Sequence, residues 1–310
     1  MIRHLLADDL TGAADASAPF AGRREVVILL PGAGAATASL TVIDTETRGL
    51  PAAAAAAAVS AACHGLAGGV FKKVDSTLRG PIGAELEAAR VALGRGAVVL
   101  APSLPAQGRT VRHGRLRVDG IDQGRVIDLV GAQRNLRVMD AVTDADLDRI
   151  AKACQSDPTV LPAGSAGLAA AFARLEGPPG DPPPVPAVEA VLIAISSRHP
   201  ASLAQAKVAR AAANPAIEVH QKLAGRLARQ VAERLEELGG PVAVLATGGD
   251  AAMAVCRELG ITSLRPRLEL LPGVALNATG RDALWLATKA GGFGGPTFLL
   301  DAAIKLLANG

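Results

Sequence analysis

The segment VFKKVDSTLRGPIGAELEAARVALGRGAVVLA, residues 70–101, contains the strongest indication of the fold. Its two ends, residues 70–74 and 97–101, are short apolar runs of the kind found in buried strands. Residues 83–94 between them have the pattern of a helix. A strand, a helix and a second strand in this order are typical of a parallel sheet covered by helices.

The same alternation continues on both sides of this segment. Further strands are expected at residues 2–6, 26–30, 40–43, 191–195 and 242–246, with another apolar run at 261–264. Helices are expected at residues 15–20, 52–66, 201–213, 223–238 and 251–259. This rhythm predicts an α/β protein with two three-layer α/β domains, mainly parallel sheets and an inter-domain cleft.

A proline-rich stretch, GPPGDPPPVP at residues 177–186, separates the two halves. Such a stretch interrupts helices and favours extended, semi-rigid backbone. We therefore expect one domain over residues 1–180 and a second over residues 187–310.

Composition limits the possible function. The 310-residue chain has a net charge of +3, three widely spaced cysteines, five Phe, one Trp and no Tyr. The cysteines form no CxxC pair, which favours a reducing compartment without disulfides or zinc. Scarce aromatics argue against nucleic-acid binding, and no long uncharged apolar run predicts a membrane span. We expect a soluble, cytoplasmic protein that acts on small anionic molecules, without nucleic-acid or membrane partners and with homo-oligomerisation left open.

Two carboxylates, Asp8 and Asp9, directly follow the first expected strand, before a turn at Thr11 and Gly12. One of them can cap the following helix. Two adjacent like charges repel, so a cation or a hydroxyl-rich ligand between them is the alternative explanation. Arg48 follows another strand and is either a surface residue or a partner for a carboxylate.

The segment after residue 70 has an unusual density of charged and hydroxyl side chains. It includes Lys72, Lys73, Asp75, Ser76, Thr77 and Arg79. A helix cap would explain one hydroxyl, whereas the whole set offers cations for an anion and a carboxylate for proton transfer. Residues 101–114 are expected to form a loop in which Gln107, Arg109 and Thr110 either line the same cleft or lie on an ordinary surface.

The second half contains two glycine-rich segments. Gly248 and Gly249 follow a strand and precede a helix, where open backbone N–H groups bind phosphate. Residues 289–296, KAGGFGGP, form another such loop, and Ser196 and Ser197 follow a third strand. Neither glycine segment fits the P-loop pattern.

Taken in order, ADDLTGAADA, TETR, KKVDSTLRGPIGAEL, PAQGRT, TGGD and KAGGFG resemble the four-carbon acid sugar kinase family over residues 5–302. Its members use ATP to phosphorylate the terminal hydroxyl of threonate, erythronate or 3-oxo-tetronate. The resemblance implies acid-binding positions at Asp8 or Asp9, Arg48, Lys73, Val74, Asp75 and Ser76. Arg79 is a further acid-binding candidate from its place in the same charged segment. It implies nucleotide-binding positions at Ser197, Gly248, Gly249, Asp250, Ala251 and Gly292.

The expected reaction is phosphoryl transfer from ATP, with Mg²⁺ bridging the phosphates. In this interpretation Arg48 and Lys73 hold the substrate carboxylate, Asp9 and Ser76 orient its hydroxyls, and Asp75 or Asp250 takes the proton. The chain is shorter than most family members, and Ser196, Ala251 and Ala290 depart from the family's nucleotide motifs. Two alternatives therefore stay open: a non-catalytic acid-binding protein, and a kinase for a different hydroxy acid.

Overall fold

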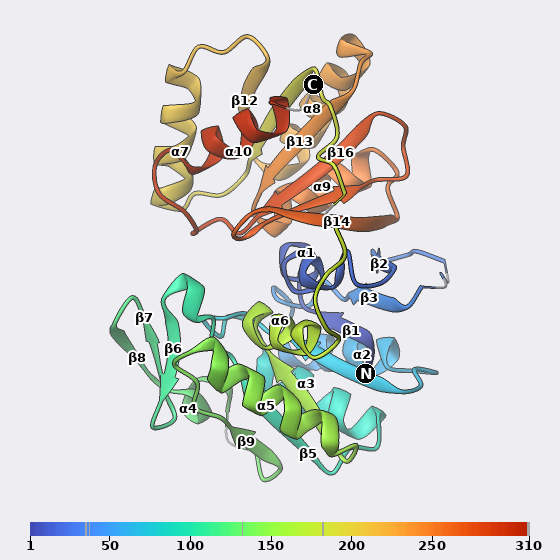
Figure 1. Cartoon of the computed structure of the whole chain (residues 1–310), viewed down its shortest axis with the longest axis vertical. Coiled ribbons are helices and arrows are strands. Elements are labelled where there is room, and N and C mark those ends of the chain that lie inside the picture. Colours follow the sequence, from blue (N-terminus) through green and yellow to red (C-terminus); the bar gives the residue numbers. More distant parts are fainter. Residues whose placement is uncertain (35, 37, 132, 182, 309–310) are drawn as a thin grey trace. The chain divides into compact units, whose positions relative to one another are not determined.

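The protein divides into two compact units (Figure 1). The N-terminal unit comprises Met1–Pro31 and Ala35–Gly180, and the C-terminal unit comprises Gly32–Gly34 and Asp181–Gly310. The computed structural model describes residues 1–34, 36, 38–131, 133–181 and 183–308. Each unit is an α/β structure, as the alternation of strands and helices predicts.

The N-terminal unit is built on a parallel sheet. Its strands run in the order β2-β3-β1-β4-β10-β5-β9. They span Val26–Leu29 (β2), Leu40–Asp44 (β3), Ile2–Ala7 (β1), Gly69–Lys73 (β4), Val160–Gly164 (β10), Ala97–Ala101 (β5) and Leu136–Val138 (β9). The helices are α1 (Leu10–Ser17), α2 (Ala52–Ala62), α3 (Ile82–Ala92), α4 (Val126–Val130), α5 (Asp144–Ser156) and α6 (Ala166–Arg174), with short 3₁₀ turns at Ala18–Phe20 and Pro105–Gln107.

Neighbouring residues of β4 show that this sheet is covered on both faces. Val70 belongs to the same buried cluster as Val59 of α2 and Leu86 of α3. The next residue, Phe71, packs edge-on against Phe172 of α6, with ring centroids 5.8 Å apart. Successive side chains of a strand point to opposite faces, so α2 and α3 cover one face and α6 covers the other.

A small antiparallel sheet begins inside the loop predicted at residues 101–114 and continues to residue 125. It comprises β6 (Arg109–Arg112), β7 (Arg115–Val118) and β8 (Ile121–Arg125). Both connections are two-residue turns with positive φ, including Asp119 (51°) and Gly120 (80°). Asp-Gly between short strands is a typical hairpin signal, and it is the clue that the loop prediction overlooked. Arg109 and Thr110 therefore lie in a strand.

The C-terminal unit has a mixed sheet, in the order β12-β11-β13-β16-β15-β14. Its strands span Ile217–Gln221 (β12), Ala190–Ile195 (β11), Val242–Thr247 (β13), Leu284–Lys289 (β16), Val274–Ala278 (β15) and Ser263–Leu271 (β14). The first four strands are parallel, whereas β15 pairs antiparallel with both β16 and β14. The prediction of a mainly parallel sheet thus holds for the N-terminal unit and only for part of this one.

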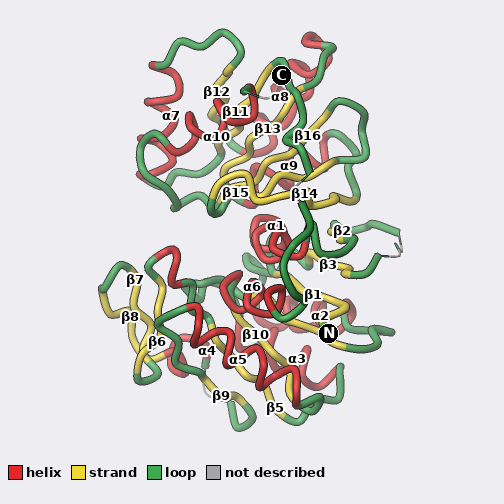
Figure 2. The backbone as a smooth tube through the Cα atoms, in the orientation of Figure 1, coloured by secondary structure: helices red, strands yellow, loops and turns green. Residues whose placement is uncertain are grey.

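Helices flank this second sheet in two pairs (Figure 2). They are α7 (Pro200–Ala211), α8 (Ala224–Leu238), α9 (Gly249–Glu258) and α10 (Phe298–Leu307). Helix α7 packs on α10, and α8 packs on α9. Ile193 of β11 and Leu245 of β13 share a buried cluster with Leu299 of α10, so α10 covers their face of the sheet. Among the described residues, no helix has the length and apolarity needed to cross a membrane.

Candidate functional site

Three adjacent strands of the N-terminal unit bring together most of the predicted acid-binding residues. Strand β1 lies between β3 and β4, and all three run parallel. Asp8 and Asp9 follow β1, Arg48 follows β3, and Asp75 follows β4. The carboxyl ends of parallel strands meet at one sheet edge, which is where open α/β sheets bind their ligands.

Arg48 is the centre of this group. Its guanidinium forms a two-pronged contact with Asp8, with Nε–Oδ2 at 2.7 Å and Nη2–Oδ1 at 3.0 Å. Nη2 also donates to Oδ1 of Asp9 at 2.6 Å. Burial by itself would raise the pKa of Asp8, but Arg48, Lys72 and Lys73 lower it below its usual value. Arg48 thus neutralises the repulsion between two adjacent carboxylates that the sequence left unexplained.

Asp9 also caps helix α1. Its Oδ1 accepts from the Gly12 N–H at 2.8 Å, and its Oδ2 accepts from the Thr11 hydroxyl at 2.5 Å. The helix begins at Leu10, so Thr11 and Gly12 lie inside it and not in the turn that the sequence analysis expects. A Cβ at Gly12 would stand 2.9 Å from Lys73 Nζ and 3.5 Å from Arg48 Nη2, which places the Lys73 ammonium beside this group.

The neighbouring lysines have different partners. Lys73 is only 4% exposed, and its Nζ donates to the backbone oxygen of Val74 at 3.0 Å. Within the described ranges no carboxylate forms an ion pair with Lys73, whereas Lys72 pairs with Glu85. The charge of Lys73 acts on Asp8 without direct contact, because it contributes to lowering the pKa of Asp8. A buried ammonium without a directly paired carboxylate is costly, and an anionic ligand would relieve that cost.

Asp75 anchors the turn that follows β4. Its carboxylate accepts from the backbone N–H and hydroxyl of Thr77 and from the backbone and guanidinium of Arg79. Burial would raise its pKa, but the hydrogen bonds from Arg79 and Thr77 and the charge of Arg48 hold that pKa far below its usual value. Ser76 next to it is half-buried. A carboxylate held in this way is a poor proton acceptor.

Asp44 is a member of this region that the sequence analysis missed. It ends β3 opposite Ala7 of β1, and it is 2% exposed. Oδ1 accepts from the Glu46 N–H at 3.1 Å, while Oδ2 has no hydrogen-bond partner among the described residues. Burial, with the nearby charges of Asp9, Glu46 and Asp8, raises its pKa well above the usual value. Its position at a strand end, four residues before Arg48, was the available signal.

The predicted nucleotide-binding residues gather at the carboxyl ends of β11, β13 and β16. Gly248 follows β13 with φ of 94°, donates its N–H to Lys289 O at 2.8 Å, and leads into α9. A Cβ at Gly248 would stand 3.9 Å from Ser197 Cβ. Gly249, Asp250 and Ala251 form the first turn of α9, where Asp250 is exposed and Ala251 is buried.

The loop after β16 completes this group. A Cβ at Gly291 would meet Ser197 Oγ at 2.8 Å, and a Cβ at Gly292 would meet His199 Nε2 at 3.1 Å. Only glycine allows such a close approach without displacing these side chains. Ser197, Gly248 and the Gly291–Gly292 pair thus lie together, as expected of residues that share one ligand.

Lys289, which the sequence analysis treated only as part of the glycine loop, is fully buried at the end of β16. Its Nζ donates to the backbone oxygens of Ala290 at 2.8 Å and Gly291 at 3.3 Å. Burial lowers its pKa to about 8, and no carboxylate in the described part of the chain forms an ion pair with it.

The donor set of this region fits a polyphosphate. The first turn of α9 presents N–H groups without intrahelical partners, as every helix start does, and Lys289 adds a nearby cation. No group of three or more metal-binding side chains occurs among the described residues. Mg²⁺ in nucleotide enzymes is commonly held by one or two carboxylates together with the phosphates, a role open to Asp250.

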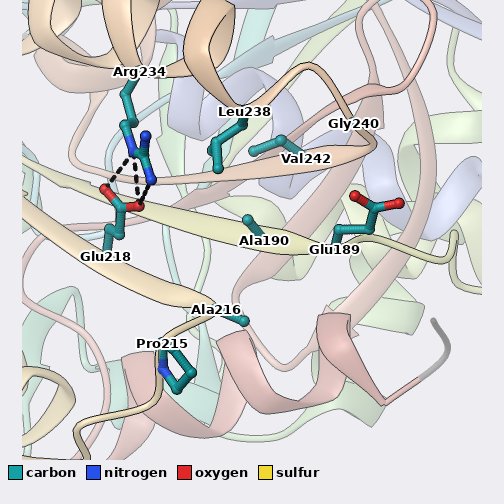
Figure 3. A pocket seen from close by; sticks show the side chains of 9 residues that line it. All are labelled: Glu189, Ala190, Pro215, Ala216, Glu218, Arg234, Leu238, Gly240 and Val242. Carbon is teal, nitrogen blue, oxygen red and sulfur yellow. Dashed lines mark hydrogen bonds and ion pairs between the residues drawn. The ribbon is translucent and has the colours of Figure 1, made fainter.

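A hollow of about 350 Å³ lies at the other end of the C-terminal sheet (Figure 3). It is lined near the starts of β11, β12 and β13, by residues such as Glu189, Ala216 and Val242. Figure 3 shows Arg234 paired with Glu218 on its wall, with Nη2–Oε1 at 2.7 Å. It contains none of the predicted site residues and lies at the amino ends of the strands, away from the usual ligand edge.

Two family profiles match the chain. One is described as a sugar-binding N-terminal domain and covers residues 4–128. The other is described as a nucleotide-binding C-terminal domain and covers residues 186–299. The first match ends before the proline-rich stretch, and the second begins at its last residue.

Whole-chain comparisons agree with these profiles. The chain is 31% identical to a D-threonate kinase of Bordetella bronchiseptica, with 96% of each chain covered. It is 28% identical to a 3-oxo-tetronate kinase of Cupriavidus necator, with 98% of this chain and 96% of the relative covered. The first alignment spans 398 residues, so the relative carries segments that this 310-residue chain lacks.

A solved Haemophilus influenzae protein has the same fold. Its TM-score is 0.71 at 20% identity, with 98% of this chain and all of that chain covered. Together with the sequence relatives, these matches extend over nearly the whole length of the protein. The chain belongs to the four-carbon acid sugar kinase family.

Proposed function

We propose that the protein transfers the terminal phosphoryl group of ATP to the terminal hydroxyl of a four-carbon sugar acid such as threonate, erythronate or 3-oxo-tetronate. The observation that carries the proposal is the buried Lys73 ammonium. It stands beside Arg48 and Asp9 at a ligand-binding sheet edge and lacks a carboxylate partner among the described residues. A substrate carboxylate is the anion that this position lacks.

The contacts divide the work between the two cations. Arg48 donates from Nε to Asp8 and from Nη2 to Asp9, so it holds those two carboxylates in place. Lys73 has one backbone contact and is the main partner for the acid. Asp9 and Ser76 then act as hydrogen-bond partners of the substrate hydroxyls. Arg79 holds Asp75 in place, and Val74 contributes through its backbone because its side chain lies in the core.

The nucleotide belongs in the C-terminal unit. Ser197, the first turn of α9 at Gly248–Ala251, and Gly292 would hold its phosphates through backbone and hydroxyl donors. ATP with Mg²⁺ supplies the phosphoryl group and offsets the charge that develops during its transfer. The chain's own residues contribute binding, orientation and the acceptance of one proton from the substrate hydroxyl.

Asp75 and Asp250 remain the proposed proton acceptors. The hydrogen bonds to Asp75 disfavour its protonation, whereas Asp250 is exposed at the start of α9. In a loose phosphoryl-transfer transition state the base removes its proton late, so orientation of the hydroxyl matters more than basicity. Asp75 is therefore better suited to orienting the hydroxyl than to accepting the proton.

Two alternatives rest on particular residues. Ala251 and Ala290 lack the hydroxyls expected in the nucleotide motifs, which would suit a protein that binds the acid without phosphorylating it. The chain is shorter than its relatives, and a shortened segment after Gly114 would reshape the acid pocket and suit a different hydroxy acid. Both alternatives keep the Lys73 site. The first differs from the main proposal because it lacks phosphoryl transfer from ATP, and the second because it acts on a different acid.

The deciding experiment is calorimetry of the full chain with ATP and Mg²⁺, alone and with D-threonate, L-threonate or D-erythronate, followed by an ADP-release assay. The proposal requires ATP binding, tightening by one acid, and ADP release that depends on that acid. Acid binding without ATP binding would instead favour the non-catalytic alternative. ATP binding without a response to any four-carbon acid would favour the alternative substrate.

A further inference from the structure

Five backbone carbonyls in the loop after β16 accept hydrogen bonds from buried side chains. They belong to residues 290, 291, 293, 294 and 295. Gln205 of α7 directs its Nε2 at the oxygens of Phe293, Gly294 and Gly295, at 2.9, 2.8 and 3.0 Å. Ser202, one turn earlier on α7, donates to Gly291 O at 2.5 Å. Lys289 donates to the oxygens of Ala290 and Gly291.

The three side chains that make these contacts are themselves fully buried. Gln205, Ser202 and Lys289 are each 0% exposed, whereas Gly292 and Gly295 of the loop are exposed. The nitrogen of the Gln205 amide must face the loop, because an oxygen there would meet three carbonyl oxygens. The loop is therefore held from its inner side by donors alone.

This arrangement fixes the direction of the loop's N–H groups. In a planar trans peptide the N–H points opposite to the C=O of the same unit. Carbonyls turned inward at residues 290, 291, 293 and 294 therefore turn outward the N–H groups of Gly291, Gly292, Gly294 and Gly295. In the described part of the chain, none of these four N–H groups donates to a protein acceptor.

At Gly291 and Gly294 a larger residue would collide with a neighbouring side chain. A Cβ at Gly294, where φ is 89°, would stand 2.4 Å from Phe298 Cγ, and a Cβ at Gly291 would meet Ser197 Oγ. Successive outward N–H groups in a turn form an anion-binding nest. The adjoining first turn of α9 adds donors of the same kind.

We propose that Gln205, Ser202 and Lys289 are positioning residues for the nucleotide phosphates. They act by holding the carbonyls of residues 290–295 inward, so that four glycine N–H groups face the phosphate chain. This inference rests on the proposed function for its ligand, and it assigns roles to three side chains that touch the loop from beneath.

The test compares Gln205→Met with wild type in the full chain. Methionine keeps the length of the side chain and removes both N–H donors, which frees three carbonyls to turn outward. We expect ADP affinity by calorimetry to fall at least tenfold, while threonate affinity changes less than twofold. Lys207→Met, on the exposed side of the same helix, is the matched control and should bind ADP like wild type.

Hydrogen exchange gives a readout that does not depend on activity. In wild type, ADP should protect the amides of residues 291–295, and in Gln205→Met that protection should disappear. Gln205→Glu covers the case in which the methionine variant fails to fold. A protonated carboxyl keeps one donor, so its ADP affinity should fall as the pH rises, more steeply than that of wild type.

The failures are distinguishable. Wild-type ADP binding without protection of residues 291–295, or unchanged binding and protection in Gln205→Met, overturns the positioning role and leaves the kinase proposal standing. A wild-type protein that binds no ADP overturns the kinase proposal. Pyrophosphate titration followed by NMR tests separately whether the four glycine N–H groups bind an anion. Changes in the chemical shifts of these four amides support the nest, and unchanged shifts refute it.

Discussion

Lys72 and Glu85 form an ion pair in the interior of the N-terminal unit, with Nζ–Oε2 at 2.7 Å and side chains 0% and 1% exposed. The contact is an ion pair without hydrogen-bond alignment, because both Glu85 oxygens lack a hydrogen-bond partner in the described residues. Lys72 also donates to the Lys73 backbone oxygen at 2.9 Å. It therefore fastens β4 to α3, whereas Lys73 forms no ion pair among the described residues and is the cation that the proposed function assigns to the acid.

Breaking this pair should destabilise the fold. Lys72→Met leaves the Glu85 carboxylate buried and unpaired, which costs about 3–5 kcal/mol of unfolding free energy. Urea denaturation measures the loss. The double variant Lys72→Met with Glu85→Leu should recover most of it, and a double variant as unstable as the single one would show that the charges are not the cause.

Lys73→Met should act on binding and not on stability. Removing the ammonium takes away the partner of the substrate carboxylate, so affinity for the acid should fall at least tenfold in calorimetry, in line with the energy of a charge-assisted hydrogen bond. The exposed Lys152→Met is the control. Threitol, which has no carboxylate, shows whether the carboxylate is what Lys73 binds. If Lys73→Met lost as much affinity for threitol as for the acid, Lys73 would shape the pocket without binding the acid.

Asp75→Asn should lower kcat by well over tenfold, because the amide cannot accept all the donors of Thr77 and Arg79 and the turn beside the substrate shifts. The pKa of Asp75 is far below its usual value, so the wild-type kcat should show no acidic limb from this group between pH 5 and 8. An unchanged kcat would remove Asp75 from the mechanism. An acidic limb that only this variant abolishes would make it the base.

Asp44→Asn should stabilise the protein at neutral pH. Because the folded pKa of Asp44 is raised above the unfolded one, the folded state binds its proton more tightly. Stability therefore falls as the pH rises from the usual carboxyl range through the folded pKa. Asparagine keeps the acceptor for the Glu46 N–H without the charge. Thermal melts at pH 4, 6 and 8 should show the gain growing with pH, and the exposed Asp282→Asn should show none.

Lys289 should make the free energy of unfolding depend on pH in the direction opposite to that of Asp44. Its folded pKa, about 8, lies below the unfolded value of 10.5, so between these values the unfolded chain binds more protons and stability rises with pH. Lys289→Met should remove this component. The difference in unfolding free energy between variant and wild type is measured at pH 7, 8.5 and 10, which cancels other titrating groups. A difference that stays constant would contradict the low pKa.

Much of the N-terminal site could be read from residue order. Acidic and basic side chains directly after apolar runs predicted the loops of Asp8, Arg48 and Asp75, since strand ends in a parallel sheet share one edge. The distinction between Lys72 and Lys73 could not be read in this way. Adjacent residues of a strand point to opposite faces, and only the packing of α3 determines which ammonium meets Glu85.

The sequence by itself determined the strand–helix alternation, the α/β class and the positions of the glycine loops, because these depend on local periodicity and on residues next to one another. The tertiary structure decided which charges are paired and which are not. Gln205 and Gly294 are 89 residues apart, and no local pattern relates them. Their contact exists because α7 packs beside the loop after β16, and this packing turns the glycine N–H groups outward.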